Sequence, residues 1–230
     1  MTDRKHPVIR AVVFDFDGTL ADTLRDIADA VNHALSKLGF PTHPVSRYRD
    51  WVGDGLARLC RRAMAGKRTD RSDDVTKWAG AYYREHSLDH TALYPGVPEL
   101  LDELKRREIP LGILSNKPHD FTVRMADALC ARWRFEAVEG CGDDALRKPD
   151  PRVALQICAE MGVEPSRTVF VGDTAIDIAT ARNAEMVSVG VTWGFRDRAE
   201  LRDAGADHII DVPGELLTIS VLRLSGESST

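Results

Sequence analysis

The sequence predicts an α/β fold, in which a parallel sheet carries helices on both faces and a helical domain is inserted after the first strand. Two observations predict this arrangement. In the second half of the chain, short runs rich in Val and Ile alternate with longer segments of helical spacing, which is typical of parallel sheets. After the first apolar run, helical spacing continues to about residue 93 without a strand-like run, which indicates the insert.

The predicted strands are short and apolar, as expected for strands that are buried on both faces. They lie at 8–17, 110–116, 167–173 and 185–194, and a further run at 206–211 predicts an edge strand. Helical spacing between and before these runs predicts helices at 97–108, 120–133, 150–162 and 175–185. Strands and helices therefore alternate along the second half of the chain.

The predicted insert contains three segments of helical spacing and ends at a turn. The segments lie at 23–39, 52–66 and 73–87. Pro95 and Gly96 then form a turn, and Pro98 can occupy the first turn of the helix that follows. We therefore divide the chain into a core of residues 1–21 and 94–230 and an α-helical cap of residues 22–93.

Composition excludes several classes of function. No apolar run approaches the roughly 20 residues that span a bilayer, and the opening residues MTDRKHP lack the features of a secretory signal. The four cysteines stand at wide, irregular spacings that match no zinc or redox motif. A net charge of -5 argues against general affinity for nucleic acid. We expect a cytoplasmic protein without membrane contact, either a monomer or a homodimer.

Polar residues stand where three of the predicted strands end. Asp15 and Asp17 end the first run, Ser115-Asn116-Lys117 the second and Gly172-Asp173 the third. In a parallel sheet the carboxyl ends of the strands share one edge, where ligands bind. Residues two apart on an extended segment point the same way, so both carboxylates of the first strand can reach one ligand.

The charges at this edge call for a cation. Asp15, Asp17, Asp173 and Asp177 are four carboxylates, and a bound phosphate adds about two negative charges. Mg²⁺, held by carboxylate oxygens and a substrate phosphate, would balance them, and Lys148 would add a positive charge if its loop returns to this edge. We also expect free backbone N–H groups at Gly18 to bind an anion. This combination suits phosphoryl transfer.

Four motifs carry a resemblance that covers essentially the whole chain. DFDGTLADT, SNK, KPDP and GDTAID, in this order, resemble the haloacid dehalogenase superfamily of aspartate-nucleophile phosphatases. The resemblance implies a Rossmann-like core, a Mg²⁺ cofactor and an aspartyl-phosphate intermediate. The position of the helical insert, the turn LYPGV and the triplet SNKP are similar to the phosphoglycolate phosphatase group. This narrower similarity implies a small phosphorylated metabolite as substrate, with 2-phosphoglycolate as the leading candidate.

The resemblance also implies a role for each residue of the site. Asp15 would be the nucleophile, and Asp17 would protonate the leaving alcohol and then deprotonate the attacking water. Ser115, the N–H of Asn116 and Lys148 would bind the phosphoryl group. The Asp15 carboxylate, the backbone carbonyl of Asp17 and the Asp173 carboxylate would hold the metal. Asp177 would assist, often through water, although it could instead stabilise the start of its helix.

Several alternatives remain open from the sequence. A sugar phosphate phosphatase, a pyrophosphatase or a phosphomutase would use the same motifs, whereas haloacid dehalogenation has no use for an acid/base at Asp17. Outside enzymes, the chain could be a binding module with little turnover. We expect VGDGL (52–56) to face the site, and Arg47, Arg49 or Arg58 to bind a substrate carboxylate.

Overall fold

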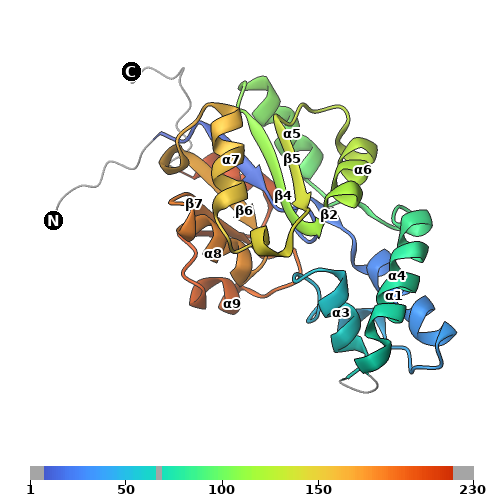
Figure 1. Cartoon of the computed structure of the whole chain (residues 1–230). Coiled ribbons are helices and arrows are strands. Elements are labelled where there is room, and N and C mark those ends of the chain that lie inside the picture. Colours follow the sequence, from blue (N-terminus) through green and yellow to red (C-terminus); the bar gives the residue numbers. More distant parts are fainter. Residues whose placement is uncertain (1–7, 66–68, 220–230) are drawn as a thin grey trace, which may run out of the picture.

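The computed structural model describes residues 8–65 and 69–219 (Figure 1). Within these residues a six-stranded sheet has the order β5-β4-β1-β6-β7-β8, and every neighbouring pair is parallel. The strands are β1 (Ala11–Phe14), β4 (Leu111–Pro118), β5 (Ala137–Cys141), β6 (Thr168–Gly172), β7 (Val187–Val191) and β8 (His208–Ile210). The predicted α/β fold class is confirmed.

Helices cover both faces of the sheet. Successive side chains of a strand point to opposite faces, and Val12 and Val13 of β1 accordingly belong to two separate apolar clusters. The helices α5 (Val97–Arg106) and α6 (His119–Cys130) contribute to the cluster of Val12. The helices α7 (Arg152–Met161) and α8 (Ala175–Asn183) contribute to the cluster of Val13. Burial of both faces explains why the central strands read as continuous apolar runs.

The strand order reverses beside β1. From β1 the chain continues through the insert to β4 and β5 on one side, and then crosses through α7 to β6 on the other side. Ligands of open α/β sheets bind outside the carboxyl ends of the strands at such a reversal. Asp15 follows the last residue of β1 directly, so the fold places it at this position.

The insert leaves and re-enters the core at one place. Strand β2 (Ala21–Asp22) pairs antiparallel with β3 (Ala92–Leu93). Between them lie α1 (Leu24–Lys37), α2 (Val45–Tyr48), α3 (Leu56–Ala63) and α4 (Ser72–His86). Figure 1 shows α1, α3 and α4 grouped beyond one edge of the core. Alanine, valine and leucine side chains of α1 and α4 are fully buried, and they belong to the same apolar cluster as Val12 of β1.

Some elements differ from the predicted ones. Strand β5 was not predicted, because Glu139 and Gly140 interrupt its apolar run and its last four residues are only half-buried, as suits an edge strand. Helix α2 is a single turn and α9 (Arg198–Asp203) has six residues, so both are too short for a periodic pattern. The strands β2 and β3 have two residues each, so they too are too short to show a pattern.

Two compositional predictions concern membranes and thiols. No helix in the part of the chain that the structure describes has the length and apolar character needed to cross a membrane. All four cysteines are free thiols, and Cys60, Cys130 and Cys158 are buried. They pack as small apolar side chains. The opening residues 1–7 and the final residues 220–230 lie outside the described part.

Candidate active site

Asp15 presents one free carboxylate oxygen to a pocket. Its Oδ1 atom accepts hydrogen bonds from the Phe16 N–H, at 2.7 Å, and from the Lys148 ammonium, at 2.8 Å. Its Oδ2 atom accepts none from the described residues. The side chain is buried and lines the pocket. Asp15 is therefore held in one orientation, with the second oxygen available to a ligand.

The turn after Asp17 requires glycine. Gly18 has a φ of +85°, and a Cβ atom there would come within 2.4 Å of Asp173 Oδ2. The Gly18 N–H donates to the Ala21 carbonyl at 2.9 Å. This N–H group is therefore not free, contrary to the expectation from the sequence, because the turn itself uses it. We leave Gly18 out of the proposed phosphate site.

Asp173 lies fully buried after β6. Its Oδ2 atom accepts the Phe195 N–H at 2.7 Å, and its Oδ1 atom accepts the Thr19 hydroxyl at 3.3 Å. Burial, followed by repulsion from Asp177 and Asp15, raises the pKa of Asp173 well above its ordinary value. A carboxylate in this position needs a nearby positive charge to remain ionised.

Asp177 stabilises a helix start and also belongs to the site. Its Oδ2 atom accepts the N–H and the hydroxyl of Thr174, at 3.0 and 2.7 Å, which forms a capping box at α8. Its Oδ1 atom accepts the Lys148 ammonium at 2.7 Å. The helix-start interpretation is confirmed, and the contact with Lys148 places Asp177 at the site, where a role toward a metal stays a prediction.

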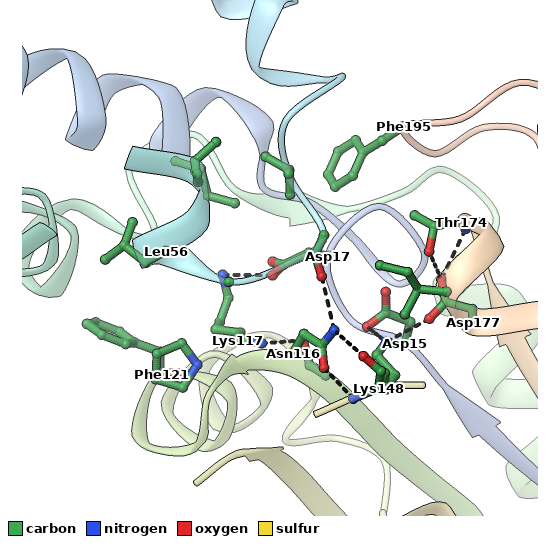
Figure 2. A pocket seen from close by; sticks show the side chains of 18 of the residues that line it. Asp15, Asp17, Leu56, Asn116, Lys117, Phe121, Lys148, Thr174, Asp177 and Phe195 are labelled. Atoms are coloured by element: carbon green, nitrogen blue, oxygen red, sulfur yellow. Dashed lines mark hydrogen bonds and ion pairs between the residues drawn. The ribbon is translucent and has the colours of Figure 1, made fainter. Parts of the chain in front are cut away.

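Lys148 lies between two carboxylates. Figure 2 shows its side chain directed toward Asp15 and Asp177, and only 3% of this side chain is exposed. Burial lowers the pKa of the Lys148 ammonium, but the charges of Asp15 and Asp177 outweigh that effect and raise the pKa above its ordinary value. Lys148 therefore stays protonated and neutralises one of the carboxylates around it.

A metal ion would fit the remaining charge. Carboxylate oxygens of Asp15, Asp173 and Asp177 lie within 4.8 Å of one another, and all three residues are buried. Burial raises the pKa of Asp15 to about 7, against the opposing charge of Lys148. Three buried carboxylates with one close ammonium leave uncompensated negative charge, and a donor set made only of oxygen suits a hard divalent cation such as Mg²⁺. The residues present therefore fit the implied metal.

The charge at this cluster makes stability depend on pH when no metal is bound. Because the pKa of Asp15 is raised from 3.8 to about 7 in the folded protein, the folded state binds more protons than the unfolded state between these values. The free energy of unfolding should therefore fall as pH rises from about 4 to about 7. Urea unfolding in EDTA at several pH values measures this fall. Asp15→Asn should make the fall shallower, and an identical pH dependence in both proteins would contradict the assignment.

Ser115 and Asn116 lie within β4, and both are buried. Ser115 lines the pocket, and its hydroxyl oxygen accepts the Lys117 N–H at 3.2 Å. The Asn116 side chain accepts the backbone N–H of Lys148 at 2.8 Å and donates to the Lys148 carbonyl at 3.3 Å. It also donates to the Gly53 carbonyl of the insert at 3.1 Å. The side chain of Asn116 therefore fixes the Lys148 loop, a role that the sequence did not suggest.

Loss of the Asn116 side chain should displace Lys148. Asn116→Ala removes all three side-chain hydrogen bonds, and we expect kcat to fall about 10- to 100-fold, because small misplacements of a catalytic group are costly. Phosphate release measures the effect. The matched control is Asn183→Ala, since Asn183 donates from an exposed position to the next residue of the same loop, Pro149. Equal losses in the two variants would contradict a specific role for Asn116.

Lys117 is the site residue that the sequence analysis missed. Its ammonium lies 2.9 Å from Asp17 Oδ2 and 2.9 Å from the hydroxyl oxygen of Tyr83, which belongs to α4 of the insert. The other oxygen of Asp17, Oδ1, is buried and has no hydrogen-bond partner among the described residues. Lys117 stands within the SNK motif, but a lysine before proline ordinarily suggests an exposed loop, so no local pattern indicated that its side chain is buried.

The pocket has a polar base and an apolar wall. Asp15, Asp17, Ser115 and Lys148 line it together with apolar side chains. The apolar set comes from the insert and from the core, and includes Ile27, Leu56, Leu59, Phe121 and Phe195. Val52, Gly53, Gly55 and Leu56 of the VGDGL segment line it, as expected. The insert therefore forms one side of the pocket.

The three arginines suggested for a substrate carboxylate do not line this pocket. Arg47 pairs with Asp50 at 3.6 Å, and Arg58 pairs with Asp54 at 3.7 Å. Arg49 donates to the Phe195 carbonyl at 2.8 Å. The prediction of an arginine contact is thus not supported by the geometry, because none of the three arginines lines the pocket and each guanidinium already has a partner.

Comparisons with known proteins agree with this geometry. The sequence profile of the haloacid dehalogenase-like hydrolases matches residues 12–191. A phosphoglycolate phosphatase from Chromobacterium violaceum is 36% identical over 214 residues, covering 90% of this chain and 95% of that protein. The phosphoglycolate phosphatase of Escherichia coli (strain K12) is 34% identical over 208 residues, covering 81% of this chain and 82% of that protein.

Solved structures show the same fold. A predicted phosphoglycolate phosphatase from Haemophilus somnus superposes with a TM-score of 0.84 at 28% identity, covering 92% of this chain and 98% of that one. CbbY from Rhodobacter sphaeroides, solved in complex with phosphate, gives a TM-score of 0.74 at 26% identity and covers 94% and 100% of the two chains. Fold, site and relatives together define a phosphoric monoester hydrolase. The chain belongs to the haloacid dehalogenase-like hydrolase family.

Proposed function

We propose that this protein is a Mg²⁺-dependent phosphatase that hydrolyses 2-phosphoglycolate through an aspartyl-phosphate at Asp15. One observation carries the proposal. In a single pocket, Asp15 offers a free Oδ2 atom while Lys148 contacts its Oδ1 atom, and Asp17 offers a free Oδ1 atom. The buried carboxylates of Asp173 and Asp177 lie close to Asp15. A nucleophile, an acid/base and a charge-neutralising group are thus adjacent, as phosphoryl transfer requires.

Asp15 and Asp17 divide the reaction between them. Asp15 Oδ2 forms a bond to phosphorus while the bond from phosphorus to the glycolate oxygen breaks, and Asp17 gives its proton to that oxygen. Asp17 then takes a proton from water as the water attacks phosphorus, which releases phosphate and restores Asp15. The Lys117 ammonium lies 2.9 Å from Asp17 Oδ2, which leaves Asp17 Oδ1, without a partner among the described residues, for the proton that is transferred.

Lys148, Ser115 and the metal site would stabilise the negative charge of the phosphoryl group. Lys148 and the Ser115 hydroxyl lie in the pocket next to Asp15 and would bind phosphoryl oxygens as charge develops. Asp15, the Asp17 carbonyl and Asp173 would hold Mg²⁺, with Asp177 assisting. Mg²⁺, when bound, would supply positive charge to the phosphoryl oxygens and to the nucleophile.

The proposed substrate rests on the relatives. Those named above are described as phosphoglycolate phosphatases, and they match this chain over most of its length, the insert included. The insert supplies apolar side chains that would exclude bulk water from the reacting groups. We propose that residues 22–93 act as a cap for this purpose, and that the enzyme works in the cytosol.

A substrate panel tests the proposal. Phosphate release would be measured with 2-phosphoglycolate, several sugar phosphates, nucleotides and pyrophosphate, each with Mg²⁺ or with EDTA. We expect 2-phosphoglycolate to have the highest kcat/KM and release to require Mg²⁺. Preference for a sugar phosphate or pyrophosphate would replace the substrate but keep the mechanism. Isomerised sugar phosphate without free phosphate would indicate a mutase, and no turnover of any kind would favour a binding module.

A further inference from the structure

The proposed substrate carries a second negative group. In 2-phosphoglycolate a carboxylate is attached to the carbon next to the ester oxygen, and a carboxylate that enters a buried pocket needs a cationic partner. Among the described residues that line the pocket, the cationic side chains are Lys117 and Lys148. Lys148 already contacts two carboxylates, at 2.8 and 2.7 Å. Lys117 contacts one carboxylate, that of Asp17, at 2.9 Å, so it is the pocket cation with less negative charge already around it.

The Lys117 ammonium has one unused donor. An ammonium group carries three N–H bonds, and the described contacts use two of them, to Asp17 Oδ2 and to the Tyr83 hydroxyl. Only 5% of the side chain is exposed, and Leu56 and Phe121 line the same part of the pocket (Figure 2). Water is therefore a poor partner for the third N–H, whereas a ligand in the pocket can accept it.

The position of Lys117 matches the length of the substrate. Asp17 would lie within about 2.6–3.2 Å of the leaving oxygen when it transfers a proton, and Lys117 lies 2.9 Å from Asp17. The carboxylate of 2-phosphoglycolate is one carbon away from that leaving oxygen. A substrate whose ester oxygen contacts Asp17 can therefore place its carboxylate within reach of the Lys117 ammonium.

We propose that Lys117 binds the substrate carboxylate and makes the enzyme selective for phosphomonoesters with a carboxylate on the carbon next to the ester oxygen. Tyr83 of the insert holds the ammonium from the other side, so recognition requires the insert to be packed against the core. The proposal rests on the proposed function. It differs from a role in positioning Asp17 alone, which would affect all phosphomonoesters equally.

The test compares two substrates of similar size. The kcat and KM values would be measured for 2-phosphoglycolate and for 2-hydroxyethyl phosphate, which has a hydroxymethyl group in place of the carboxylate. The proteins are the wild type, Lys117→Met, Lys117→Gln and Lys117→Arg, all with Mg²⁺. Lys117→Gln removes the charge but can still donate to Asp17, and it replaces Lys117→Met if that variant does not fold. Lys105→Met is the control, because Lys105 donates to the Arg132 carbonyl on the surface and does not line the pocket.

In the neutral variants, the ratio of kcat/KM for 2-phosphoglycolate to that for 2-hydroxyethyl phosphate should fall about 10- to 100-fold, as loss of a charged hydrogen bond implies. The change should appear mainly in the KM for 2-phosphoglycolate. Lys117→Arg should keep most of the preference, and Lys105→Met should keep all of it. Equal losses for both substrates would overturn the proposal and leave only positioning of Asp17. A wild-type enzyme without preference for 2-phosphoglycolate would instead refute the proposed function, and this inference with it.

Discussion

Asp15→Asn should lower kcat for phosphate release by at least about 10⁴-fold, which is the scale seen when a catalytic nucleophile is removed. The amide cannot form the phosphoryl ester, although it fills the same space. Folding should not suffer, because the substitution removes one of three buried carboxylates that repel one another, and Lys148 keeps its contact with Asp177 at 2.7 Å. Phosphate release and thermal unfolding of the purified variant measure the two effects.

The control for this prediction is Asp29→Asn. Asp29 pairs with Arg25 at 3.5 Å on the exposed side of α1, so its substitution should leave both activity and stability near wild type. If Asp15→Asn retained more than about 1% of the wild-type kcat, Asp15 would not be the nucleophile.

Lys148→Met should lower kcat by about 10³-fold and also destabilise the protein. The activity falls because the phosphoryl group and Asp15 lose a preorganised positive charge. Stability falls because Asp15 and Asp177 lose the ammonium that contacts both of them, and an uncompensated buried charge costs about 3–5 kcal/mol. Steady-state assays and urea unfolding in EDTA give the two values.

Mg²⁺ should restore part of the stability that Lys148→Met loses, since a cation at the same carboxylates would replace some of the missing charge. Lys105→Met is the control, because Lys105 donates to the Arg132 carbonyl on the surface and its loss should change neither quantity. A Lys148→Met protein with wild-type stability in EDTA would contradict the described charge balance around Asp15.

The polar ends of the strands could be predicted because their sequence signal is local. Asp15, Ser115 and Asp173 each follow an apolar run directly, and the edge of a parallel sheet brings such positions together. The helical insert was equally visible, since α1 and α4 are long enough to show a period. These features depend on patterns within about 15 residues of the chain.

The remaining features depend on contacts between distant segments. Asn116 contacts Lys148 and Gly53, which are 32 and 63 residues away, and Lys117 contacts Tyr83, which is 34 residues away. No periodicity encodes such pairs. The Gly18 N–H was expected to be free, because the sequence does not show that the Ala21 carbonyl accepts it within the turn. Local patterns thus located the site, whereas the three-dimensional packing determined which donors are free within it.

The central claim is that Asp15 becomes covalently phosphorylated, and rapid acid quenching tests it directly. Enzyme mixed with 2-phosphoglycolate and Mg²⁺ would be quenched within the first turnover, digested and analysed by mass spectrometry. The account predicts a peptide containing Asp15 that is heavier by one phosphoryl group, and no such peptide from Asp15→Asn. Turnover that continues while every peptide stays unmodified, or a phosphoryl group on another residue, would contradict it.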